Sequence, residues 1–449
     1  MCKRFIYALS ALQFMAWVSV AQIENMKFLH LGIDDGLSQN SIYCILQDKQ
    51  GFIWIGTPNG LNKYDGYEFT IYQKNTKVSN SLSSNGVRDI VEDADGNLWI
   101  ATDGGGLNML DRTRQKFIAY RHDANNPASI AHDFINSLAL DSKGDLWIAT
   151  NGAGIDHFNR QTKKFTHHIH DENNPHSIND NYVYRIYEDK KHNLWVGTKH
   201  GGLNHYDTKQ NKFTPFLLDK KSTGQIGANM VTVIFEDSKN QLWLGTSGAG
   251  ITLFDRTTHT FTNYSHDPLN KNSIPNNSIL SINEDDKGNL WVGTENGGLS
   301  IMDLDTREIN NYQQDDIDKA SLSSNSIWTI YKDVQHNMWL GTFSGGVNFY
   351  NLEVNKFMHY RHTASPQSLS NNTVFSIIED AKKNLWVGTD GGGLNMMPHN
   401  GNKFKHYKHE NGNSKSISGN NVLKVYEDHD GNIWIGTWGE GITVFNPQT

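Results

Sequence analysis

A tryptophan returns at nearly constant spacing along the chain, and this repeat limits the possible folds more than any other feature. Nine of the twelve tryptophans keep the register, at intervals of 45, 47 or 48 residues. Each follows an aspartate by six residues and precedes a threonine by three. A period of this length predicts a repeat architecture in which neighbouring units bury one another's apolar faces. The repeat tryptophans are Trp54, Trp99, Trp147, Trp195, Trp243, Trp291, Trp339, Trp386 and Trp434.

Each unit divides into four short apolar runs separated by turn residues. In the unit at 372–409 the runs are NTVFSIIED, LWVGT, LNMMP and KFKHYKH. They are rich in Val, Ile, Trp, Phe and Tyr, and none has a helical apolar period over eleven or more residues. Four-stranded units repeated radially predict an all-β fold, a β-propeller whose blades are the repeats. We expect the tryptophan on the second strand to pack between neighbouring blades.

The two ends of the repeat region predict how the ring closes. Residues 27–31 match the fourth strand of a unit, such as 116–120, whereas the last unit ends at Thr449 after its third strand, 441–445. We expect the spare N-terminal strand to complete the last blade and cover its open edge. Nine units leave two architectures open, because propellers typically have four to eight blades. They form either one nine-bladed ring or a seven-bladed ring followed by the start of a second propeller.

Residues 1–21 have the pattern of a secretory signal peptide. Lys3 and Arg4 precede a largely apolar stretch at 5–20, which ends in a small-residue cleavage motif. We therefore expect export to the periplasm and a mature region of propeller repeats at 22–449. The alternative is an uncleaved membrane anchor, although the apolar stretch is shorter than the about 20 residues that span a bilayer.

The charge balance argues against a nucleic-acid-binding protein, and the cysteine count argues against a fold held by disulfides. The chain has 40 Lys plus Arg against 48 Asp plus Glu, a formal net charge of -8 that offers no basic field to a polyanion. We therefore expect no nucleic-acid partner. Cys2 and Cys44 are the only cysteines, so removal of the leader leaves one thiol and no internal disulfide.

Neither a metal site nor a catalytic group stands out. The stretch 93–97 (DADGN) is similar to the opening of a calcium loop, but its twelfth position is Gly104 rather than glutamate. We interpret the stretch as a hairpin turn in which Asp93 accepts hydrogen bonds from backbone amides. Ser, His and Asp occur without a nucleophile elbow, which disfavours a hydrolase triad. A recurrent histidine after the fourth strand is separated from the next by a blade, so we expect no shared metal and no cofactor.

The units resemble the two-component regulator propeller repeat. The resemblance rests on 420–445 (NNVLKVYEDHDGNIWIGTWGEGITVF), on the opening DGLSQNS at 35–41 and on GFIWIGT at 51–57. The opening is similar to the first repeat of hybrid two-component sensors of gut Bacteroidetes, and the likeness covers about 27–449. It implies a periplasmic sensor region that recognises an oligosaccharide and associates with a second sensor unit. Signal transduction by phosphorelay would then belong to a membrane helix and histidine kinase domains outside this chain.

Two positions vary between otherwise similar units, and they predict the ligand site. One lies eleven residues before each repeat tryptophan, and the other directly follows the repeat threonine. Both would lie around the mouth of a propeller channel, where aromatic rings stack on sugars and polar groups bond hydroxyls or ionic substituents. We expect ligand contacts from Arg88, Tyr184, Trp328, Phe375, Trp438, Asp103, Lys199, Phe343 and Asp390.

Two other function classes stay open. An exported propeller enzyme acting on polysaccharide, as a lyase or a hydrolase, would need a convergent cluster of catalytic residues in or over the channel. A protein-binding scaffold would expose an apolar patch and show no sugar affinity. The repeat resemblance favours the sensor, and we expect no enzymatic activity from this chain.

Overall fold

The structure, a computed structural model, describes residues 26–113, 115–217, 230–351, 360–363, 365–399, 401 and 403–447. The signal peptide expected at 1–21 lies outside these residues. Apart from the short 3-10 helix η1 (Ile33–Asp35), every element within them is a β-strand, so the predicted all-β class is confirmed. No helix in the described part of the chain is long and apolar enough to cross a membrane.

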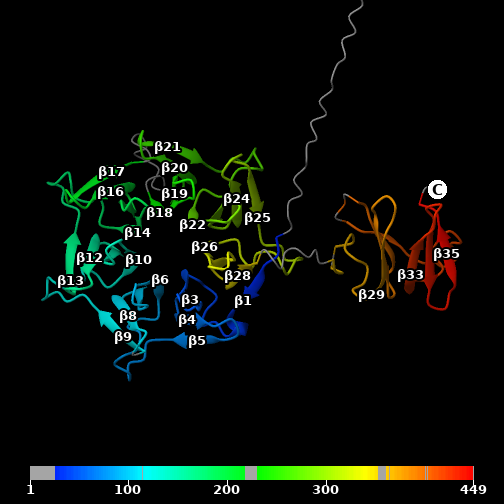
Figure 1. Cartoon of the computed structure of the whole chain (residues 1–449), viewed down its shortest axis with the longest axis horizontal. Helices are drawn as coiled ribbons and strands as arrows, with labels where there is room; N and C mark the ends of the chain where they lie inside the picture. Colours follow the sequence, from blue (N-terminus) through cyan, green and yellow to red (C-terminus); the bar gives the residue numbers. More distant parts are fainter. Residues whose placement is uncertain are drawn as a thin grey trace, which may run out of the picture.

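Seven four-stranded antiparallel sheets form the blades of a ring (Figure 1). Blade 1 contains β2 (Cys44–Gln47), β3 (Ile53–Thr57), β4 (Gly60–Tyr64) and β5 (Phe69–Tyr72). Blade 2 contains β6 (Val87–Glu92), β7 (Leu98–Thr102), β8 (Leu107–Asp111) and β9 (Lys116–Tyr120). Blade 3 contains β10 (Ile135–Leu140), β11 (Leu146–Thr150), β12 (Ile155–Asn159) and β13 (Lys164–His168). Blade 4 contains β14 (Val183–Glu188), β15 (Leu194–Thr198), β16 (Leu203–Asp207) and β17 (Lys212–Phe216).

The remaining ring blades follow the same order, except that the last one takes its outer strand from the start of the chain. Blade 5 contains β18 (Val231–Glu236), β19 (Leu242–Thr246), β20 (Ile251–Asp255) and β21 (Thr260–Tyr264). Blade 6 contains β22 (Ile279–Glu284), β23 (Asn289–Thr294), β24 (Leu299–Asp303) and β25 (Ile309–Tyr312). Blade 7 contains β26 (Ile327–Lys332), β27 (Met338–Thr342), β28 (Val347–Tyr350) and β1 (Leu29–Leu31).

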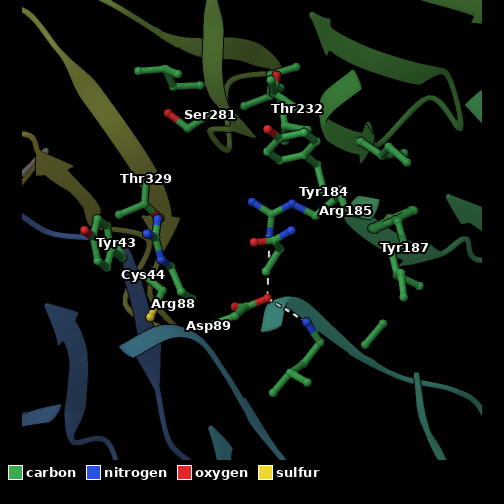
Figure 2. A pocket seen from close by; sticks show the side chains of 18 of the residues that line it. Tyr43, Cys44, Arg88, Asp89, Tyr184, Arg185, Tyr187, Thr232, Ser281 and Thr329 are labelled. Carbon is green, nitrogen blue, oxygen red and sulfur yellow. Dashed lines mark hydrogen bonds and ion pairs between the residues drawn. The ribbon is translucent and has the colours of Figure 1, made fainter. Parts of the chain in front are cut away.

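The inner strands show that the ring is closed. Each of β2, β6, β10, β14, β18, β22 and β26 contacts the next inner strand, and β26 contacts β2. Together they surround a cavity (Figure 2). Of the two architectures that the sequence left open, the structure has the seven-bladed ring, with the last two repeats outside it.

The N-terminal strand closes the seventh blade, so the expectation that it completes the ninth was wrong. β1 pairs antiparallel with β28, with Leu29 opposite Phe349 and Leu31 opposite Val347. Just before β1, Phe28 is 4% exposed within the apolar cluster between blades 6 and 7. The physical reason is that β1 pairs along the outer edge of β28, in the seventh blade, and so cannot also cover the edge of the ninth unit.

Repeats eight and nine form two sheets outside the ring (Figure 1). The first contains β29 (Val374–Glu379), β30 (Leu385–Thr389), β31 (Gly393–Met397) and β32 (Lys405–Tyr407). The second contains β33 (Val422–Glu427), β34 (Ile433–Thr437) and β35 (Ile442–Phe445). β29 packs against β33 as neighbouring inner strands do in the ring. Trp434, on the outer side of the pair, is 42% exposed, whereas the other eight repeat tryptophans are 0–6% exposed.

A hydrogen bond between the repeat aspartate and the repeat tryptophan recurs in all nine units. The indole Nε1–H donates to the carboxylate six residues earlier, at 2.7–3.1 Å. In the second unit the other oxygen of Asp93 accepts the backbone N–H groups of Asp95 and Asn97. The interpretation of this stretch as a hairpin turn is confirmed, because the carboxylate is occupied by the turn and by the indole.

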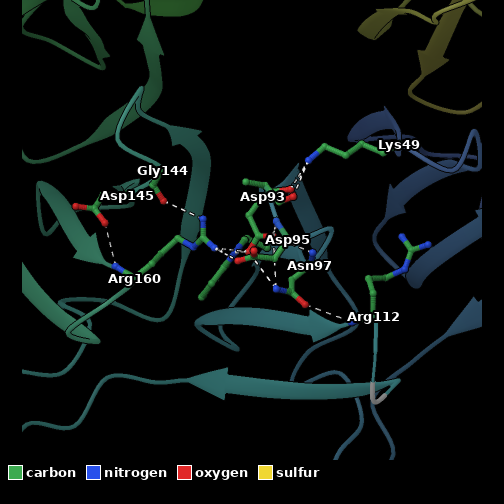
Figure 3. Close-up of polar contacts among 10 residues, drawn as sticks. Lys49, Asp93, Asp95, Asn97, Arg112, Gly144, Asp145 and Arg160 are labelled. Carbon is green, nitrogen blue, oxygen red and sulfur yellow. Dashed lines mark hydrogen bonds and ion pairs between the residues drawn. The ribbon is translucent and has the colours of Figure 1, made fainter.

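An arginine from the next blade joins several of these pairs. Arg112 of blade 2 lies 2.6 Å from the Asp48 carboxylate of blade 1. Arg160 of blade 3 lies 2.9 Å from the carboxylate of Asp93 (Figure 3). Burial alone would raise the pKa of Asp48, but the hydrogen bonds from Trp54 and Arg112 outweigh it and lower this pKa. Asp48 therefore stays ionised and connects the hairpin, the indole and the neighbouring blade.

The tryptophans pack between blades as predicted, and this packing gives a stability prediction. Trp243 is fully buried in a cluster with Ile279 and Ile282 of the next blade. We expect Trp243→Ala to lower the free energy of unfolding by about 3–5 kcal/mol, as for other large buried aromatics. Urea unfolding followed by circular dichroism measures the change. The control is Tyr67→Ala, because Tyr67 is 94% exposed; equal effects of the two changes would contradict the packing.

A second prediction concerns β1. A chain that begins at residue 34 instead of residue 22 loses the pairing with β28 and the buried Phe28. It exposes an unpaired strand edge in blade 7. We expect the ring to melt at a clearly lower temperature and less cooperatively than the chain from residue 22. An unchanged calorimetric transition would show that β1 does not close the ring.

Candidate functional site

The inner strands enclose a cavity of about 650 Å³, within the usual size range of small-ligand sites. All seven blades contribute to it. In each blade, the residue eleven positions before the repeat tryptophan lines the cavity wall. The sequence predicted this place for that variable position. These residues are Tyr43, Arg88, Asn136, Tyr184, Thr232, Leu280 and Trp328.

A β-bulge places these side chains. In the inner strands of blades 2 to 7 the register against the second strand shifts by one residue at this position, for example between Val87 and Asp89. A bulge leaves the extra residue out of the hydrogen-bond ladder and interrupts the in-out alternation of the strand. Two consecutive residues therefore line the cavity in several blades, such as Arg88 with Asp89 and Tyr184 with Arg185.

Aromatic rings form a continuous stack on one side of the cavity. Tyr43 of blade 1 and Trp328 of blade 7 are stacked with ring centroids 5.1 Å apart and an interplanar angle of 8°. Phe343, in the turn after β27, lies 5.0 Å from Trp328. On the other side of Tyr43, the Arg88 guanidinium lies 4.2 Å from the ring centroid. This cluster thus runs across three neighbouring blades, and Trp328 and Arg88 cover the two faces of the Tyr43 ring.

Arg88 is held in place by an acidic partner. Its Nε donates to both oxygens of Asp103 at 2.8–2.9 Å, from the turn that follows β7. The two residues were predicted for the site independently, from different variable positions, and the structure joins them. Figure 2 shows the Arg88 side chain beside Tyr43 at the cavity wall.

A second charged pair joins Asp89, the residue after Arg88, to Arg185 of blade 4, and the sequence analysis missed it. Asp89 accepts the backbone N–H groups of Leu138 and Ile90, and Arg185 Nη1 lies 3.6 Å from it. Burial raises the pKa of Asp89, although Arg185 opposes the shift. Strict strand alternation would have pointed both residues away from the cavity. The signal that could have found them is a charged residue directly after the variable position.

The remaining predicted residues fall into two groups. Lys199 lies near the mouth, with Nζ 5.3 Å from the ring of Tyr182, and Phe343 and Asp103 contact cavity residues as described above. Phe375, Trp438 and Asp390 belong to repeats eight and nine, outside the ring. The structure does not bring these three to the cavity, because the seventh blade already closes the ring. Their position in the repeat matches that of cavity residues, but it did not predict where they lie in the structure.

The recurrent histidines lie exposed in the links between blades, and each also contacts a backbone carbonyl of its own link. Nδ1 of His122 lies 2.9 Å from the carbonyl oxygen of Ile130, and His170, His266, His362 and His409 make the same contact with the corresponding carbonyl. Each contact connects the two ends of the segment that links one blade to the next. In the part of the chain that the structure describes, no three His, Cys, Asp or Glu side chains are grouped as metal ligands.

Comparisons with known proteins agree with this geometry. The sequence pattern of a family described as two component regulator propeller matches once in each unit, at residues 36–59, 81–104, 129–152, 177–200, 225–248, 273–296, 321–344, 368–391 and 416–439. The extracellular domain of a hybrid two-component system from B. thetaiotaomicron is 30% identical, with a TM-score of 0.76. The match covers 94% of this chain and 54% of that domain, so the chain spans about half the length of this relative.

Two further matches are narrower. A histidine kinase of Formosa agariphila is 42% identical over 76 residues, which are 17% of this chain and 6% of that protein. A virginiamycin B lyase of Staphylococcus aureus has a TM-score of 0.54 at 18% identity, over 73% of this chain and 99% of the lyase. At that identity the lyase shares the fold alone. The likeness to extracellular sensor domains is therefore the one that bears on function.

The cavity wall contains one thiol, and its burial gives a testable expectation. Cys44 is 7% exposed, and burial raises its pKa well above the ordinary value for cysteine. Because the thiolate is the reactive form, we expect almost no labelling by iodoacetamide at pH 8 in the native chain from residue 22. Labelling in urea should be complete within the same time. Rapid native labelling, measured by mass spectrometry, would contradict the closed packing of blade 1 against blade 2.

Proposed function

The chain belongs to the two-component regulator propeller family, and from this premise we propose that it is the exported ligand-sensing part of a hybrid two-component sensor that binds an oligosaccharide in the ring cavity. The observation that carries the proposal is the convergence of the variable position from all seven blades on one cavity. The framework residues repeat from unit to unit, whereas these seven differ. Such a wall has the composition of a recognition surface rather than of a structural core.

The chemistry of the wall suits a sugar. Trp328 and Tyr43 supply aromatic area on the cavity wall, and apolar area of this kind packs on the C–H faces of pyranose rings. Arg88 and Tyr184, with the nearby polar side chains, supply donors and acceptors for hydroxyl groups. Asp103, Lys199 and Phe343 at the mouth would contact substituents of the same ligand.

Output by phosphorelay would belong to kinase domains outside this chain. Ligand binding would act by changing how two sensor units associate, and the membrane would be reached only through other parts of the protein. Nucleic acid is not proposed as a partner, because the net charge is -8. A cleaved leader at 1–21 would direct the chain to the periplasm.

The rival proposal is a propeller enzyme, since a lyase shares the fold. Two observations favour the sensor. The carboxylate of Asp89, which lines the cavity, already accepts two backbone N–H groups and lies beside Arg185. Cys44, also on the wall, has a raised pKa and is therefore a poor nucleophile. Cleavage of any glycan by the purified chain would overturn the proposal in favour of the enzyme.

Calorimetric titration tests the function directly. The chain from residue 22 is titrated with oligosaccharides derived from xylan, mannan, laminarin and polygalacturonate. For the glycan that binds, we expect Trp328→Ala and Arg88→Ala each to weaken affinity by about tenfold or more, roughly 1.4 kcal/mol. Tyr67→Ala is the matched control on the exposed outer surface. If neither cavity variant weakens binding, the ligand is held elsewhere and the proposed site is wrong.

A further inference from the structure

Two large aromatic side chains are exposed just outside the cavity, on blades 3 and 4. Phe134 is 45% exposed and Tyr182 is 44% exposed. Each lies two residues before a cavity-lining residue, Asn136 and Tyr184 respectively. The sequence analysis predicted neither residue for the site, and neither lines the cavity. Their exposure so close to the mouth needs an explanation, because side chains of this size gain by burial.

The backbone between blades fixes both rings at the rim. Tyr182 forms a bridge to Asn151, in the turn after β11 of the preceding blade, and Asn151 N donates to the carbonyl of Phe134 at 3.0 Å. Each ring rests against a glycine of the preceding blade's turn. A Cβ built at Gly104 would lie 3.2 Å from the Phe134 ring, and one at Gly152 would lie 3.3 Å from the Tyr182 ring. The glycines therefore let both rings lie close over the turns.

The aromatic residues at this position are specific to two blades. The same place in the other five ring units is taken by smaller or unbranched side chains: Ser41, Gly86, Met230, Ser278 and Ser326. The packing of a blade thus does not require an aromatic ring at this position. Blades 3 and 4 lie across the ring from blades 7 and 1, which carry the Tyr43, Trp328 and Phe343 stack. Phe343 is itself 51% exposed.

Polar groups accompany the two rim rings. Lys199 Nζ lies 5.3 Å from the Tyr182 ring centroid. Beside Phe134, Arg121 lies 3.3 Å from Asp133 and donates to the carbonyl of Gly104. Flat aromatic faces with hydrogen-bonding side chains at their edges are suited to sugar units, whereas a protein-docking patch would be more continuously apolar.

We propose that Phe134 and Tyr182 form an outer subsite for an extended oligosaccharide, whose inner units occupy the cavity and whose outer units stack on these two rings. The inference rests on the proposed function and adds the class of ligand: a chain longer than the cavity holds, rather than a mono- or disaccharide. Phe343 on the opposite rim would contact the same chain where it crosses the mouth. Selection by length then comes from the rim, and selection by sugar type from the cavity.

The test compares a disaccharide and a hexasaccharide from the glycan series that binds in the titration panel. The wild type should bind the hexasaccharide more tightly. Phe134→Ala and Tyr182→Ala should each weaken the hexasaccharide by about fivefold, the size expected for one lost stacking contact, and leave the disaccharide within about twofold. Trp328→Ala should weaken both sugars. Tyr67→Ala should weaken neither, and melting temperatures verify that each variant is folded.

The outcomes separate the two proposals. If Trp328→Ala weakens both sugars but the rim variants change neither, or change both equally, the outer subsite is overturned and the cavity site stands. If Trp328→Ala has no effect while a glycan still binds, the cavity site is overturned. If no glycan in the panel binds the wild type, the proposed function fails and the outer subsite fails with it.

Discussion

The hydrogen bond from each repeat indole to the aspartate six residues earlier is the interaction on which the ring depends. It joins the turn after the inner strand to the second strand, and it fixes the face on which the indole leaves the sheet. In eight of the nine units that face is covered and the indole is at most 6% exposed. Arg112 and Arg160 add a contact from the next blade to the same carboxylates. A hydrogen bond to a charged group contributes about 1.5–3 kcal/mol, so repetition around a ring gives a rigid frame.

This frame leaves the bulged position of the inner strand free to vary. In blades 2 to 7 the bulge takes one residue out of the ladder and turns it towards the axis. With Tyr43 of blade 1, seven side chains share one cavity. Blades 7 and 1 contribute aromatic residues, blade 2 contributes charged ones, blade 4 contributes both kinds, and blades 3, 5 and 6 contribute smaller or aliphatic ones. The same rigid ring can therefore present many different walls.

The sequence predicted what depends on local pattern and missed what depends on competition between distant parts. The period, the four strands, the packing of the tryptophans and the cavity position of Arg88, Tyr184 and Trp328 follow from spacing alone. The blade that β1 completes did not, because the strand edge with which β1 pairs is decided by contacts between distant parts of the chain. The prediction that Phe375 and Trp438 lie at the cavity was wrong because the ring closes at the seventh blade, and repeats eight and nine lie outside it. Arg185 was missed because the bulge overrides strand alternation.

The central claim is that the inner strands of the seven-bladed ring recognise the ligand while the tryptophan frame stays unchanged. Hydrogen exchange followed by mass spectrometry, on the chain from residue 22 with and without a glycan that binds, tests it most directly. The account predicts slower exchange in peptides that cover the starts of β2, β6, β14 and β26 and the turns around the cavity mouth. It predicts no change in β13, β17 or β21. Slower exchange confined to β29–β35, or spread evenly over all blades, would contradict it.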